Sequence, residues 1–215
     1  MNKKRNLFLS IFFTVISIVY TLIVKNIDVK AIGPNNSSVG LSSLNNWFKN
    51  LIGINMDIYK LTEILGLCTF VIVGIYGVTG LIMLIKRKSL FKVDREIISL
   101  GVLYVLMGII YLLFEKVVIN YRPILIDGEL EASYPSSHTL LSICICISSL
   151  IVSKKYLDNK KYNIFTFLTM LLLTLVFIGR TISGVHYLSD IIGGVIISIN
   201  LLMIFYTILR WKNNN

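Results

Sequence analysis

Six long apolar stretches run through the 215-residue chain and constrain its fold more than any other feature. A helix needs roughly 20 apolar residues to cross a bilayer. A chain that is 55% hydrophobic and only 15% charged is too apolar for an ordinary soluble domain. We therefore predict an all-α fold, a single integral-membrane domain (1–215) built as a bundle of six transmembrane helices. The stretches cover residues 7–24, 62–85, 96–118, 138–153, 162–179 and 187–209.

The positive charge of the chain follows this topology. With the N-terminus placed in the cytoplasm, most of the 21 Lys and Arg residues fall in cytoplasmic segments, as the positive-inside rule requires. Membrane orientation thus explains the formal net charge of +10, and we expect no nucleic-acid partner. We predict a multi-pass protein of the cell membrane with both termini in the cytoplasm. The abundance of Ile, Asn and Lys favours a bacterial source.

The longest hydrophilic segment, 25–61, lies outside the cytoplasm in this arrangement. Apolar residues recur within it at helical spacing, which predicts a short amphipathic helix on the outer membrane surface. Such a helix suits a lid or guide for a lipid substrate, and it suits a packed cap on the bundle equally well. The residues are Leu41, Leu44, Trp47, Phe48, Leu51 and Ile52.

Cysteines and glycines in the apolar stretches are interpreted as packing residues. Cys68, Cys144 and Cys146 show neither a disulfide framework nor the spacing of a metal site, so no metal is expected. Small residues in membrane spans usually let helices approach closely. The glycines concerned are Gly74, Gly77, Gly80, Gly101, Gly193 and Gly194.

The only two histidines, His138 and His186, both fall on the outer side together with several polar and basic residues. Buried cations without counter-charges would cost several kcal/mol each, and a bound phosphate removes that cost. Snorkelling at a helix end can explain Lys116, but it explains Arg122 and Arg180 poorly. A packing role would suit one lone histidine, whereas two histidines with matching neighbours favour catalysis.

These residue types are suited to covalent phosphoryl transfer. His186 and Asp190 are four apart, so on a helix they share a face, and the carboxylate can accept from one ring nitrogen. The other nitrogen of His186 is then free to attack phosphorus. His138 can protonate the leaving oxygen, and a helix starting near Ser136 or Ser137 would direct N–H groups toward the phosphate.

The same residues resemble the three signature motifs of the type 2 phosphatidic acid phosphatase superfamily, a family of membrane lipid phosphatases. Those motifs are Lys, six residues, Arg-Pro; Pro-Ser-Gly-His; and Ser-Arg, five residues, His, three residues, Asp. The resemblance covers about residues 60–210, with the motifs inside 96–190. This chain has Lys116, five residues, Arg122-Pro123; then Pro135-Ser136-Ser137-His138; then Gly179-Arg180, five residues, His186, three residues, Asp190.

The resemblance implies a role for each matching residue. His186 would form a phosphohistidine, His138 would act as general acid, and Asp190 would orient His186. No cofactor or metal is implied, and the site would lie at the extracytoplasmic end of the bundle. The implied substrate is a lipid phosphate or diphosphate, such as undecaprenyl diphosphate, phosphatidic acid or phosphatidylglycerol phosphate. The implied phosphate-binding residues are Arg122, Arg180, Lys116, Ser136 and Ser137.

The chain departs from the family motifs at three positions. Glu115 stands where the family has Lys, Ser137 replaces Gly, and Gly179 replaces Ser. These departures leave open a second function, a weak or inactive relative that binds or moves lipid phosphates. A related group of haloperoxidases uses a similar anion pocket for vanadate, but those enzymes are soluble and the hydropathy of this chain argues against that activity.

Overall fold

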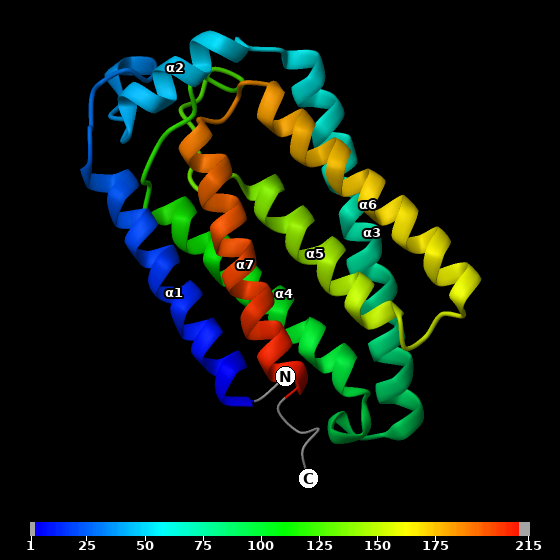
Figure 1. Ribbon diagram of the computed structural model, residues 1–215. Coiled ribbons are helices and arrows are strands. Elements are labelled where there is room, and N and C mark those ends of the chain that lie inside the picture. The colour runs from blue at the N-terminus through cyan, green and yellow to red at the C-terminus, as the bar shows by residue number, and fades with distance from the viewer. Residues whose placement is uncertain (1–2, 211–215) are drawn as a thin grey trace.

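The computed structural model describes residues 3–210, so residues 1–2 and 211–215 of the predicted domain lie outside the described part. The predicted all-α membrane bundle is confirmed, and no strand occurs within 3–210 (Figure 1). Two short 3₁₀ helices lie in the segments that connect the α-helices: Pro34–Asn36 and Leu90–Lys92. The α-helices are α1 (Lys3–Asn26), α2 (Ser42–Ile52), α3 (Met56–Arg87), α4 (Arg95–Lys116), α5 (Ser137–Ser153), α6 (Asn159–Ile182) and α7 (Leu188–Arg210).

Each predicted apolar stretch falls in its own helix, and five of these helices are long and apolar enough to cross a membrane. The exception is α5, whose 17 residues span only about 26 Å at 1.5 Å per residue. It lies in the middle of the bundle, between α3, α6 and α7 (Figure 1). Because α5 is packed on several sides by protein, it has less contact with lipid than the outer helices.

The outer helices expose apolar side chains in large numbers. Of the most apolar 18-residue stretch in each helix, only 11% is buried in α3, against 50% in α7. In a soluble protein such surfaces would be aggregation sites, whereas in a bilayer they face hydrocarbon. The chain is therefore a multi-pass membrane protein. Exposed examples are Phe8, Phe12, Val71, Leu112 and Phe167.

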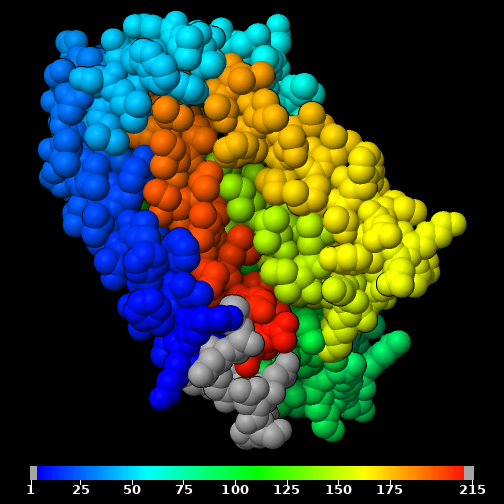
Figure 2. All heavy atoms as spheres, in the orientation of Figure 1, coloured from blue at the N-terminus to red at the C-terminus, as the bar shows by residue number. Residues whose placement is uncertain are grey.

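The segment 25–61 contains α2, which lies across one end of the bundle, and its side chains form a layer over that end (Figure 2). Its buried residues are Ser42, Asn45 and Phe48. Asn45 is fully buried, donates to Ser189 Oγ (2.8 Å) and accepts from Ser189 N (3.0 Å). Leu44, Trp47 and Leu51 on the predicted apolar face are exposed instead. Hydrogen bonds to α7 thus hold α2 as a cap on the bundle.

The glycines of the spans divide into two groups. A Cβ on Gly193 would lie 2.3 Å from Tyr134 Cε2, and one on Gly80 would lie 2.8 Å from Ile97 Cγ2, so close packing requires both. The packing interpretation is wrong for three others, because a Cβ there would meet nothing within 4 Å: Gly74, Gly77 and Gly101.

The cysteines are all free, and Cys144 and Cys146 are buried as packing residues. Cys68 differs from the expectation, because it is exposed on α3.

Candidate active site

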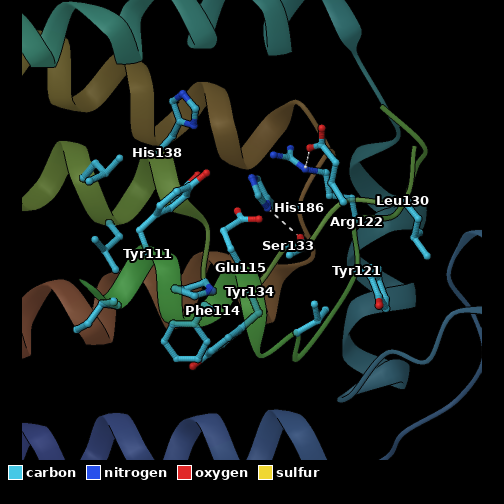
Figure 3. Close-up of a pocket in the computed structure, with 18 of the residues that line it drawn as sticks. Tyr111, Phe114, Glu115, Tyr121, Arg122, Leu130, Ser133, Tyr134, His138 and His186 are labelled. Atoms are coloured by element: carbon cyan, nitrogen blue, oxygen red, sulfur yellow. Dashed lines mark hydrogen bonds and ion pairs between the residues drawn. The ribbon is translucent and has the colours of Figure 1, made fainter. Parts of the chain in front are cut away.

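A cavity of about 640 Å³ opens at the end of the bundle that α2 covers, away from the start of α1 and the end of α7. Its walls come from α3, α4, the start of α5, the segment 117–136 and the turn between α6 and α7. Both histidines line it, together with Arg122, Ser133 and Ser137 (Figure 3). The fold therefore brings residues far apart in the sequence to one cavity.

His186 lies in the turn that precedes α7 and is 3% exposed. Its Nδ1 is 2.9 Å from Ser133 Oγ, the contact drawn in Figure 3, and Ser133 donates its hydroxyl proton to Asp190 Oδ2 at 2.6 Å. Since that proton is committed to Asp190, Ser133 accepts from Nδ1–H. The lone pair of His186 is then on Nε2, which has no hydrogen-bond partner among the described residues.

The charge state of His186 favours this arrangement. Burial lowers the pKa of His186 well below its ordinary value, and the nearby charges of Arg122 and Arg180 lower it further. The imidazole is therefore neutral at pH 7, as a nucleophile must be.

Asp190 is fully buried at the start of α7. The expected direct bond to His186 is replaced by the bridge through Ser133. The reason is that α7 begins at Leu188, so helical spacing does not apply to His186. Asn120 Nδ2 (2.9 Å), Ser189 Oγ (3.2 Å) and Tyr187 N (3.1 Å) also donate to this carboxylate. Neither Asn120 nor Ser133 was predicted as a site residue, although Asn120 lies within the first motif and Ser133 is a polar residue two positions before the second.

The two arginines have partners that the sequence analysis did not anticipate. Arg180, fully buried, forms an ion pair with Glu63 Oε1, and Arg122 Nε lies 2.9 Å from Glu131 Oε2. The expectation of cations without acidic counter-charges is therefore wrong. Within residues 3–210, Nη1 of Arg122 and both Nε and Nη1 of Arg180 have no hydrogen-bond partner, so these N–H groups are not committed elsewhere. Arg122 lines the cavity, whereas Arg180 is buried behind its lining.

Tyr59 of α3 supports both arginines. Its ring centroid is 4.9 Å from Cζ of Arg180 and 5.9 Å from Cζ of Arg122. An aromatic face within about 6 Å attracts a guanidinium.

His138 is the second residue of α5. Its Nε2 lies 3.6 Å from Glu63 Oε1, and its Nδ1 has no hydrogen-bond partner in the described part of the chain. A Cβ on Gly66 would lie 2.3 Å from His138 Cδ2, so the glycine makes room for the imidazole.

The remaining predicted phosphate-binding residues lie in three different environments: Lys116, Ser136 and Ser137. Lys116 is exposed at the end of α4 and does not line the cavity, whereas Glu115 does. One residue of helix turns a side chain by roughly 100°, which explains the exchange. Ser136 is fully buried, with its Oγ 3.0 Å from Thr139 Oγ1. Ser137 lines the cavity.

The start of α5 adds a potential anion site to the cavity. The first N–H groups of a helix have no intrahelical partners and favour bound anions. Ser137 and His138 place this helix terminus at the cavity wall. Within residues 3–210, no three His, Cys, Asp or Glu side chains are grouped to hold a metal ion.

Comparison with known proteins supports the resemblance. Residues 116–214 match the model of the PAP2 superfamily. The fold is similar to the crystal structure of a transmembrane PAP2-type phosphatidylglycerolphosphate phosphatase from Bacillus subtilis, with a TM-score of 0.65 at 14% identity. That similarity covers 95% of this chain and 98% of the other. No curated protein matches the sequence significantly.

Proposed function

We propose that this chain is a membrane phosphatase that cleaves lipid phosphates through a phosphohistidine, because residues 116–214, which include both histidines and Arg122 of the cavity, match the model of the PAP2 superfamily. The observation that carries the proposal is the buried Nε2 of His186, which is unpaired at a cavity beside unused arginine donors. A neutral imidazole nitrogen aimed at an anion site is a nucleophile for phosphorus.

The reaction has two steps. In the first, His186 Nε2 forms a bond to phosphorus while the bond to the leaving oxygen breaks, and His138 gives that oxygen a proton. The positive charge on His186 is stabilised through Ser133 by Asp190. In the second, water attacks the phosphohistidine, His138 takes the proton of the water, and phosphate leaves.

Fixed donors would stabilise the charge that builds up on the phosphoryl oxygens. Arg122 Nη1, Arg180 Nε and Nη1 and the N–H groups at the start of α5 are all available for this role. Because they are already held in place, little reorganisation is needed during the reaction.

Apolar side chains of the cavity wall support a lipid substrate. Ile110 and Phe114 of α4 and Leu140 and Leu141 of α5 line the cavity together with the polar groups. Undecaprenyl diphosphate, phosphatidic acid and phosphatidylglycerol phosphate are the candidates, and the charge distribution favours an extracytoplasmic site.

A second function is favoured by one observation. Lys116 lies outside the cavity and Glu115 inside it, so the cavity holds a negative charge where the family motif has a positive one. A catalytically weak relative that binds or moves lipid phosphates would be consistent with this exchange.

Phosphate release distinguishes the two functions. Purified protein in detergent should release inorganic phosphate from a panel of lipid phosphates in the presence of EDTA, and His186→Ala should abolish release while leaving the protein folded. Binding of these lipids without release from any of them would favour the second function. An unchanged rate in His186→Ala would remove it as the nucleophile.

A further inference from the structure

Glu63 lies on the α3 wall of the cavity, outside the residues that match the family model. Its Oε1 forms an ion pair with the buried Arg180 and lies 3.6 Å from Nε2 of His138. A single carboxylate oxygen therefore contacts both a phosphate-binding arginine and the expected general acid.

One face of α3 is built around this carboxylate. Tyr59, Glu63 and Gly66 recur at intervals of four and three residues, so they lie on the same side of the helix. Tyr59 supports the two arginines, and Gly66 leaves space for the ring of His138. On α3, the residue one turn before Glu63 thus packs on the arginines, and the residue one turn after it packs beside His138.

Glu63 does not have to leave when phosphate binds. Arg180 uses Nη2 for Glu63, while its Nε and Nη1 have no hydrogen-bond partner among residues 3–210 although the side chain is fully buried. A guanidinium has five N–H donors, so Arg180 can bind a phosphoryl oxygen and Glu63 together. The carboxylate can therefore remain beside His138 throughout the reaction.

A general acid must carry its proton at the moment the leaving group departs. The geometry points to Glu63 as a positioning residue that orients the imidazole of His138 and favours its protonated form as the leaving group departs. This inference rests on the proposed function. In the first step His138 passes its proton to the leaving oxygen and Glu63 stays ionised, and the proton returns from the attacking water in the second step.

The leaving group provides a specific test. An alkoxide leaving group needs a proton, whereas 4-nitrophenolate is weakly basic and leaves without one. We expect Glu63→Gln to lower kcat/KM about 10-fold or more for dioctanoyl phosphatidic acid but less than about 3-fold for 4-nitrophenyl phosphate, since general acid catalysis contributes about 10²–10⁴-fold in total. The ratio kcat/KM is used because it reports the step in which the leaving group departs.

Glu131→Gln is the matched control, because it removes the carboxylate beside the other arginine, and no ion pair joins Glu131 to His138 within the described residues. It should affect both substrates equally. If Glu63→Gln does not fold, Glu63→Asp carries the test, because it keeps a charge for Arg180 and shortens the reach to His138. Equal losses on both substrates, or no loss, in the folded Glu63 variant would overturn the inference. If the wild-type protein hydrolyses another lipid phosphate of the panel instead of phosphatidic acid, that lipid takes its place in the test, and a wild-type protein that hydrolyses none of them would instead refute the proposed function.

Discussion

At the scale of single residues, the candidate nucleophile depends on a serine that neither the motifs nor helical periodicity indicated. Ser133 connects His186 Nδ1 to Asp190 Oδ2 in a fully buried chain of hydrogen bonds. Sequence reasoning could select His186 and Asp190 because their residue types suit the chemistry. It could not place a third residue between them, because the loop conformation that brings Ser133 there is set by tertiary contacts.

Removal of the Ser133 hydroxyl should reduce kcat with little change in KM, because the bridge acts on charge that develops on His186. We expect Ser133→Ala to lower kcat by about 10-fold or more, with Ser133→Thr closer to wild type. In the double variant with Asp190→Asn, the losses should be less than additive, since both residues act on His186 through the same bridge. Steady-state kinetics of the wild type, the three single variants and the double variant checks this, and fully additive losses would indicate that Asp190 acts independently.

The lowered pKa of His186 also predicts how stability changes with pH. The folded protein holds this histidine neutral, whereas the unfolded chain binds a proton near the ordinary value of 6.5. Acid therefore favours the unfolded state, by about 1.4 kcal/mol per pH unit below that value until the folded protein also protonates. The Tm of detergent-solubilised protein should fall from pH 7 to pH 5, and more steeply than in His186→Gln. Parallel curves for the two proteins would contradict this.

At the scale of elements, the sequence predicted the spans well and the packing faces less well. Apolar runs of about 20 residues determine membrane helices almost by themselves, because a helix makes all of its backbone hydrogen bonds within one segment. Packing faces depend on neighbours instead. For this reason α2 buries Asn45 rather than Trp47, and a Cβ on Gly74 of α3 would meet nothing within 4 Å while one on Gly66 would meet His138.

The two glycines of α3 give a matched pair of variants. Gly66→Ala would place a Cβ 2.3 Å from His138 Cδ2, so the imidazole must move and phosphate release should fall at least about 10-fold, given what general acids contribute. Gly74→Ala meets nothing within 4 Å, so activity should be unchanged and the helix more stable by up to about 1 kcal/mol. Activity and Tm of both variants test this. Equal activity in the two would show that the position of His138 does not matter.

At the scale of the whole molecule, hydrogen bonds join the cap around α2 and the residues behind the cavity into one unit. Asn120 accepts from Gly40 N (3.0 Å) and donates to Asp190 (2.9 Å), and Asn45 binds Ser189. The charge pattern of the sequence predicts which end of this unit faces the cytoplasm, but hydrogen bonds between distant loops leave no periodic signal in the sequence.

The predicted orientation can be measured in cells. Glu129 lies in the segment that borders the cavity, and Lys160 lies at the other end of the bundle, at the start of α6. In a Cys68→Ala background, Glu129→Cys should react with a membrane-impermeant maleimide from outside, and Lys160→Cys should react only after the membrane is opened. The reverse pattern would place the cavity in the cytoplasm.

The bridge from His186 through Ser133 to Asp190 also has a consequence for biosynthesis. The nucleophile and its carboxylate belong to the last third of the chain, while the groups that hold them come from the cap and the middle loop. A nascent protein cannot assemble this unit until α7 has entered the bilayer against α1. The site therefore forms only when the bundle is complete. A chain that stalls before α7 lacks Asp190, the carboxylate at the end of the bridge.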